Sequence, residues 1–184
     1  SDPALNSYGA IVRKDWLDEI NMEVPQTIEE WERMLRAFRD QKGAKYPISY
    51  AFSSASWGAF VGAYGTMDGL YLDDGTVKYG ALEPGYKEFL TKLNEWYQEG
   101  LIASDFSTMD SKTLDSNIIN GFSGAASGSV GSGLGRWMSA ATDPKFQLVA
   151  APHPVLQAGE KPQFGQMQLR TPGRYTALSR DCSD

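Results

Sequence analysis

Hydrophobic residues recur at helical spacing in several stretches of the chain, and this pattern predicts its helices. The clearest stretch opens with Thr27 and Glu30, which are spaced as a capping box. Apolar residues then follow every three or four positions as far as Phe38, while charged residues occupy the other face. The pattern predicts an amphipathic helix over residues 28–41, with Trp31 in the core rather than at a ligand.

A second amphipathic helix is predicted from Pro84 to the residue before Gly100, where the glycine and the following leucine match a Schellman ending. Its expected apolar stripe consists of Tyr86, Leu90, Leu93 and Tyr97, with Phe89 and Trp96 beside it. A third helix is predicted over residues 111–120. A short helical turn after residue 13 carries Trp16, and the tryptophans on these helical stripes are expected in the core.

Strands are predicted between the helices. They cover residues 10–12, 47–52, 122–129, 146–151, 165–169 and 174–179. Residues 70–80 read as a β-hairpin with Asp74 and Gly75 as its turn. The neighbouring aspartates of this turn supply too few oxygen ligands for calcium, so no metal site is expected there. Because helices alternate with strands, the chain is predicted to have an α/β fold.

Composition narrows the range of functions. The chain has 184 residues, 41% of them hydrophobic and 22% charged, which suits one soluble domain or one large lobe. A net charge of -6 and a pI near 4.8 argue against nucleic-acid binding, because phosphate backbones require a basic surface. No apolar run reaches the roughly 18 residues of a membrane span.

Cysteine and histidine each occur once, so neither an intrachain disulfide nor a zinc site of Cys and His ligands can form. The single histidine, His153, stands between two prolines, and we expect a solvent-facing loop residue rather than a catalytic one.

A glycine- and serine-rich stretch occupies residues 121–137. It is not a phosphate loop, because Gly135 is followed by Arg136 and Trp137 rather than by a lysine and a serine or threonine. Two compatible interpretations remain: a closely packed strand of small residues, and the wall of a ligand cleft at a strand-to-helix junction over residues 129–137. In the second interpretation Arg136 reaches a hydroxyl pair or a carboxylate, and Trp137 stacks on a sugar face.

Several segments together resemble one family. Residues 13–40 (RKDWLDEINMEVPQTIEEWERMLRAFRD), 74–106 (DGTVKYGALEPGYKEFLTKLNEWYQEGLIASDF) and 119–128 (INGFSGAASG) are similar, in the same order, to segments of family 1 extracellular solute-binding proteins. These proteins serve ABC importers, and the likeness is to the long, lipoprotein-anchored members from Firmicutes. The resemblance covers roughly residues 8–180, which makes it far more specific than a single motif.

The resemblance implies a two-lobed, periplasmic-binding-protein-like fold of type II that closes on a ligand at a hinge. Residues 1–184 would form one α/β lobe, a mixed sheet flanked by helices, with residues 1–9 as a hinge or crossover segment. We expect a fragment that lacks the other lobe. An acidic loop common in the family, similar to a calcium loop, is replaced here by QKGAKYP, so neither a metal nor a cofactor is expected.

The function implied is capture of an extracellular solute, an oligosaccharide, for delivery to the permease of an ABC importer. The full-length protein would be a monomer at the cell surface, held to the membrane only by an anchor that this fragment lacks. Two alternatives stay open: a protein- or glycan-interaction module without a transport role, and a glycoside-active enzyme domain. An enzyme would need two carboxylates about 5 to 9 Å apart across a cleft. No convincing pair is found, so no catalytic residue is expected.

The expected ligand-binding residues combine flat aromatic rings with planar polar groups, as a sugar site requires. They are Trp57, Tyr64, Ser129, Arg136 and Trp137. For the two tryptophans, a place in the cleft and a place in the core both stay open. Gln166 and Gln168 either line the cleft or face water.

Overall fold

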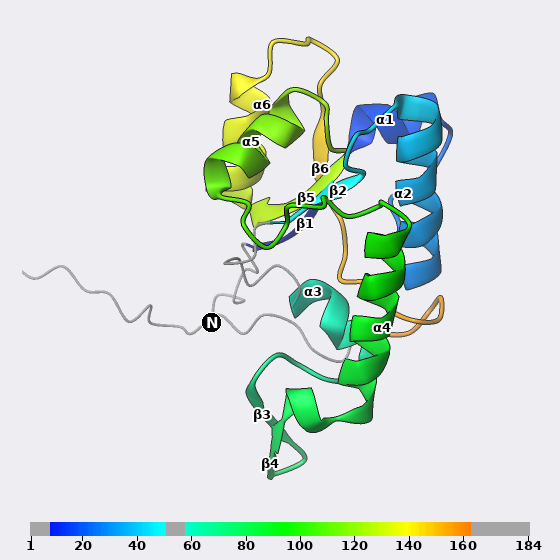
Figure 1. Cartoon of the computed structure of the whole chain (residues 1–184), viewed down its shortest axis with the longest axis vertical. Coiled ribbons are helices and arrows are strands. Elements are labelled where there is room, and N and C mark those ends of the chain that lie inside the picture. The colour runs from blue at the N-terminus through cyan, green and yellow to red at the C-terminus, as the bar shows by residue number, and fades with distance from the viewer. Residues whose placement is uncertain (1–7, 51–57, 163–184) are drawn as a thin grey trace, which may run out of the picture.

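The computed structural model describes residues 8–50 and 58–162 of the chain and shows an α/β fold built on a four-stranded mixed sheet (Figure 1). The strands are β1 (Tyr8–Arg13), β2 (Ile48–Ser49), β5 (Ala125–Ser129) and β6 (Leu148–Ala150), in the order β2-β5-β1-β6. β1 is antiparallel to both of its neighbours, whereas β2 and β5 are parallel. The predicted α/β class with a mixed sheet is thus confirmed.

Two layers of helices cover the two faces of the sheet (Figure 1). The helices are α1 (Lys14–Glu19), α2 (Ile28–Lys42), α3 (Gly58–Val61), α4 (Pro84–Gln98), α5 (Ser111–Ile119) and α6 (Arg136–Ala140). Side chains of β1 alternate between the layers: Ala10 and Val12 pack in a core with α1, α2 and α4, while Ile11 packs in a second core with α5 and α6. This alternation follows from the two-residue period of a strand.

The capping box at the start of α2 forms as predicted. The Glu30 N–H donates to Thr27 Oγ1 over 3.1 Å, and the Thr27 N–H donates to Glu30 Oε2 over 3.0 Å. Backbone N–H donors, that of Gln26 foremost, lower the pKa of the Glu30 carboxyl. The indole of Trp31 is fully buried, as the helical pattern indicates.

The buried face of α4 differs from the predicted stripe. Phe89 and Trp96 are 3% and 1% exposed, whereas Leu90 and Tyr97 are 49% and 38% exposed. The rings of Trp96 and Phe60 meet edge to face at 5.8 Å, so the helix is rotated toward the aromatic core. The Schellman ending at Gly100 is confirmed, because the N–H after it donates to the Trp96 carbonyl over 2.8 Å.

The predicted hairpin is also present, as β3 (Leu70–Asp73) and β4 (Thr76–Tyr79). Asp74 and Gly75 have φ angles of 44° and 77°, as a type I′ turn requires. Short 3₁₀ turns flank the hairpin over Gly62–Tyr64 and Gly80–Leu82.

Three predicted segments cannot be compared with the structure. Residues 51–52 of the predicted strand over residues 47–52, and the two predicted strands after residue 164, lie outside the described residues. The expected hinge segment, residues 1–9, is described only from residue 8 onward.

Candidate functional site

The glycine-rich stretch forms the strand-to-helix junction that its sequence predicts. β5 ends at Ser129, whose Oγ accepts a hydrogen bond from the Ser132 N–H over 3.2 Å and caps the next helix. That helix begins as a π-helical segment over Val130–Gly135 and continues into α6. The helix therefore begins about two turns before Trp137.

Glycine serves close packing at this junction. A Cβ atom at Gly128 would lie 3.0 Å from Trp137 Cη2, and one at Gly133 would lie 3.0 Å from the Cα atom of Gly128. The π-helical segment thus rests directly on the strand backbone, which a larger side chain at either glycine would prevent. The packed-strand interpretation of the stretch is correct here.

Trp137 does not offer a stacking surface. Its side chain is 1% exposed and lies in the second hydrophobic core, and its Nε1–H donates to Asp115 Oδ1 over 2.6 Å. The expectation that this ring stacks on a sugar face is wrong. The glycines of β5 and the π-helical segment leave room beneath the helix, and the indole fills it.

Arg136 is exposed but already paired within the chain. Its two terminal nitrogens donate to both carboxylate oxygens of Asp115, over 2.6 and 2.7 Å, and its Nε donates to the Ser132 carbonyl over 2.7 Å. This two-pronged pairing ties α6 to α5. A ligand carboxylate or hydroxyl pair would have to compete with Asp115 for the same guanidinium edge.

Among the described residues, the remaining predicted ligand contact, Tyr64, lies apart from this junction. Tyr64 is half-buried and packs against the core on the α2–α4 face, with its ring 6.0 Å from that of Phe89. Burial raises the pKa of its phenol to about 12. Trp57, Gln166 and Gln168 lie outside the described residues. The predicted set is therefore not brought together in one cluster of described side chains.

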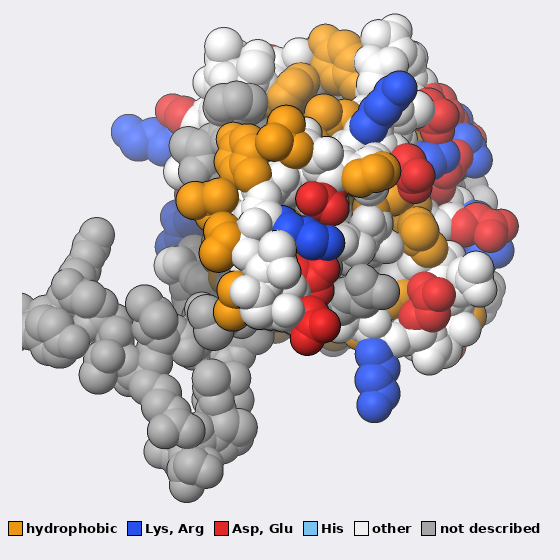
Figure 2. Space-filling view, turned by 90° about the horizontal axis from the view of Figure 1, so that it is seen from below, with side chains coloured by type: hydrophobic (Ala, Val, Ile, Leu, Met, Phe, Trp, Pro, Cys, Tyr) orange, Lys and Arg blue, Asp and Glu red, His pale blue; other side chains and the backbone are white. Residues whose placement is uncertain are grey.

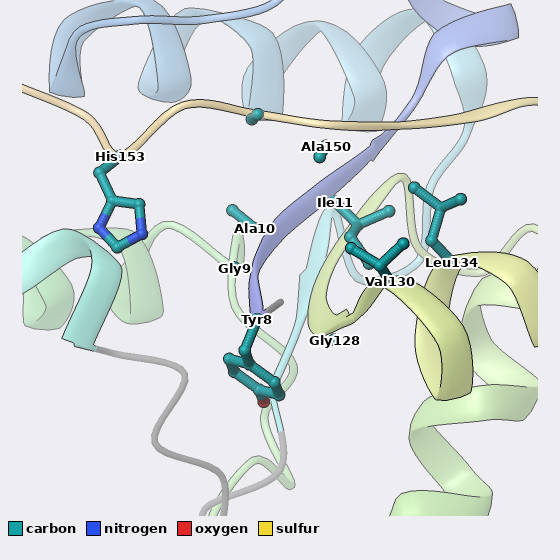
Figure 3. Close-up of a pocket in the computed structure, with 10 residues that line it drawn as sticks. Tyr8, Gly9, Ala10, Ile11, Gly128, Val130, Leu134, Ala150 and His153 are labelled. Carbon is teal, nitrogen blue, oxygen red and sulfur yellow. The ribbon is translucent and has the colours of Figure 1, made fainter. Parts of the chain in front are cut away.

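A hollow of about 100 Å³ opens at the end of the sheet, beside the junction (Figure 3). It is lined by residues 8–11 of β1, Gly128 of β5, Val130 and Leu134 of the π-helical segment, and Ala150, Ala151 and His153. We call this space the sheet-end hollow. Sequence reasoning missed it, because its lining comes from three separate stretches of chain whose juxtaposition depends on the strand order.

His153 lies at one end of the sheet-end hollow and Tyr8 at another (Figure 3). The imidazole is half-buried rather than fully solvent-facing, and this loss of hydration lowers its pKa. The sequence predicts the loop position of His153 correctly but overstates its exposure. The phenol and the imidazole are the only polar side chains among the lining residues, and none of these residues carries a carboxylate or a primary amine.

No group of three or more His, Cys, Asp or Glu side chains in residues 8–50 and 58–162 could hold a metal ion. None of the helices described in those ranges is long and apolar enough to cross a bilayer.

Curated proteins are similar to the chain in sequence, although no family model matches it. Lipoprotein LipO of Bacillus subtilis is 28% identical over 131 residues, which cover 62% of this chain and 25% of LipO. The polygalacturonan/rhamnogalacturonan-binding protein YtcQ of the same organism is 27% identical over 128 residues, covering 63% of this chain and 25% of YtcQ. The chain spans about a quarter of the length of these curated relatives.

Solved structures share its fold. The alginate-binding protein AlgQ2 superposes with a TM-score of 0.65 at 22% identity, covering 78% of this chain and 32% of AlgQ2. A solute-binding protein of Bifidobacterium longum infantis superposes with a TM-score of 0.66 at 20% identity, covering 82% of this chain and 34% of that protein. It is described as HMO-binding and ABC-transporter-associated. A Bacillus licheniformis sugar transporter solved with stachyose superposes with a TM-score of 0.60 at 22% identity. The match covers 85% of this chain and 42% of the transporter. The resemblance read from the sequence motifs and the expected lobe-like fold are both confirmed.

Proposed function

We propose that this chain is one lobe of an extracellular solute-binding protein of an ABC importer, and that it forms one wall of an oligosaccharide site. One observation carries the proposal: YtcQ among the sequence relatives and AlgQ2 among the fold relatives are both named as glycan-binding proteins, and this chain covers only part of the length of each. YtcQ and AlgQ2 are named for the glycans polygalacturonan, rhamnogalacturonan and alginate, and the Bacillus licheniformis transporter was solved with stachyose.

The end of the sheet is the best candidate for the ligand-facing surface of the lobe. It carries the Ser129 cap and the sheet-end hollow, and the exposed, Asp115-paired side chain of Arg136 follows within about two turns of the same helix. A second lobe would close over this wall, exclude water and supply further contacts, so we expect weak binding by the lobe alone. Tyr64 and Trp57 stay proposed ligand contacts.

The proposal involves binding without chemical conversion of the solute. We propose that delivery goes to the permease of the importer, and that the full-length protein is a monomer attached at the cell surface. The kind of protein found among the fold relatives supports this view, since those named above are binding or transport proteins.

The test uses two proteins: this chain, and a longer protein in which it is joined to its second lobe. Isothermal titration with oligogalacturonides, alginate oligosaccharides and stachyose should give clear binding by the longer protein and weaker binding by the chain. Product analysis of the same mixtures should show intact sugars. Glycan cleavage would favour the enzyme alternative, and no binding by the longer protein to any glycan would refute carbohydrate capture.

A second candidate function rests on the exposed face of the hairpin. Four cross-strand neighbours on this face are 48–73% exposed: Leu70, Leu72, Val77 and Tyr79. Figure 2 views the molecule from the end that carries the hairpin, and hydrophobic side chains gather there beside charged ones. An apolar face of this kind is typical of a protein contact. Leu72→Lys should leave glycan binding unchanged and weaken only such a contact, which cross-linking in cells would detect.

A further inference from the structure

The sheet-end hollow arises where β6 leaves β1. The Ala151 N–H donates to the Ala10 carbonyl over 2.9 Å, and Pro152 follows at once. Ile11 and Ala150 form the last pair of the β1–β6 ladder at this end, so the start of β1 has no strand on that side among the described residues. Figure 3 shows the resulting space between β1, the segment that carries His153, and the side chains of Val130 and Leu134.

The lining of the hollow favours an apolar group over a hydroxyl group. Most of the wall consists of aliphatic side chains and glycine backbone, with Ile11, Val130 and Leu134 as its largest aliphatic members. A hydroxyl group that enters a hollow with such a lining loses its hydrogen bonds to water and finds few protein partners in their place, which is unfavourable. An alkyl or acyl group loses no hydrogen bond and gains by leaving water.

The size of the hollow sets an upper limit on the group. An engineered apolar cavity of about 150 Å³ in another protein holds a benzene molecule. The present volume of about 100 Å³ is smaller, so it suits a group below the size of a benzene ring. A methyl or an acetyl group meets this limit, whereas a whole sugar ring does not.

We propose that the sheet-end hollow is a subsite for a small alkyl or acyl substituent carried by the bound glycan: the C6 methyl of a 6-deoxy sugar, an O-methyl group or an O-acetyl group. The inference rests on the proposed glycan-binding function, because the hollow lies beside the Ser129 junction at the proposed ligand-facing end. Such a subsite would determine which substituted glycans bind most tightly. One methylene-sized group in a hydrophobic pocket changes affinity by about 10- to 200-fold.

Gly9→Val should fill the hollow and leave the fold intact. A Cβ atom built on Gly9 meets no other atom within 4 Å, although Gly9 lines the hollow. Gly9→Val therefore projects a branched side chain into open space at a strand position, where valine is well tolerated. Thr76→Val is the matched control, since it places the same side chain on an exposed strand far along the chain from every lining residue.

The first measurement probes the hollow by itself. Methyl-labelled protein is titrated with methyl acetate, and the NMR signals of Ile11, Val130 and Leu134 are followed; ethylene glycol serves as a hydroxylated probe of similar size. We expect methyl acetate to shift these signals and ethylene glycol not to. Gly9→Val should weaken the methyl acetate response at least tenfold, while Thr76→Val should leave it unchanged. If methyl acetate leaves the three signals unmoved, the inference is overturned.

The second measurement tests the link to the glycan. L-Rhamnose and L-mannose differ only in the C6 hydroxyl, and 2-O-acetyl-L-mannose gives the acyl arm. We expect one of the substituted sugars to bind this chain at least about tenfold more tightly than the unsubstituted one, and Gly9→Val to abolish the difference. Equal affinities would overturn the subsite while leaving glycan binding intact. If methyl acetate binds but neither this chain nor the two-lobed protein binds any glycan, the proposed function is overturned instead.

Discussion

Replacing Trp137 by alanine should destabilise the chain strongly, because the indole is a core residue of the α5–α6 face. The side chain is 1% exposed, and truncating a buried tryptophan or phenylalanine to alanine costs about 3–5 kcal/mol. Loss of the indole N–H donor adds little to this cost, because Asp115 keeps its two hydrogen bonds from Arg136. For a chain of this length the expected fall in melting temperature is about 6–20 °C.

Urea unfolding followed by circular dichroism measures this change. Met138→Ala is the matched control, because Met138 is the next residue of the same helix and is 42% exposed, so its truncation should change stability by about 0.5 kcal/mol or less. Trp137→Phe should fall between the two, since it keeps an aromatic ring in the core and loses only part of its volume. If Trp137→Ala and Met138→Ala have the same urea midpoint, the indole is not part of the core, and a surface role in stacking returns.

Further predictions concern single residues and the solution conditions. Thr27→Ala should cost about 1 kcal/mol through loss of the helix cap, and coincident urea midpoints would contradict this. Gly124→Ala should cost at least about 1–3 kcal/mol, because its Cβ atom would lie 2.3 Å from Phe38 Cδ2; an unchanged thermal melt would refute the close contact. Burial lowers the pKa of His153, so the unfolded chain takes up this proton first, and stability should fall as the pH drops through the unfolded value near 6.5 and level off below the folded pKa. The stability of the His153→Asn variant should change less than that of the unaltered chain between about pH 7.5 and about pH 5.5. An identical change in the two proteins would exclude this effect. A chelator should leave the melting temperature unchanged, whereas a clear drop would point to a bound metal.

Local features of the fold could be predicted from the sequence because their partners lie a few residues away. The capping box joins Thr27 to Glu30, the hairpin turn depends on Asp74 and Gly75, and the Schellman ending is fixed around Gly100. Each is set by backbone geometry within one or two turns of chain. The α/β class follows in the same way from the alternation of such local elements.

Features that depend on distant segments were predicted less well. On α4, the pattern of apolar residues allowed more than one buried face, and the ring of Phe60, far earlier in the chain, selects the face of Phe89 and Trp96. Trp137 follows a glycine-rich segment that reads as an open surface. It is buried because the π-helical segment folds back onto β5. The sheet-end hollow depends on where β6 leaves β1, which no local signal encodes.

Glycine marks two opposite environments in this chain, and the difference lies in what occupies the space of the missing side chain. At Gly124 and Gly128 that space holds aromatic rings, those of Phe38 and Trp137, so these glycines are packing positions. At Gly9 the space is open and belongs to the sheet-end hollow. The glycine-rich stretch therefore builds the rigid wall, whereas a single glycine outside it, on the neighbouring strand, leaves the gap. Because the wall is close-packed, it cannot collapse into that gap, and the space stays available to a group of matching size.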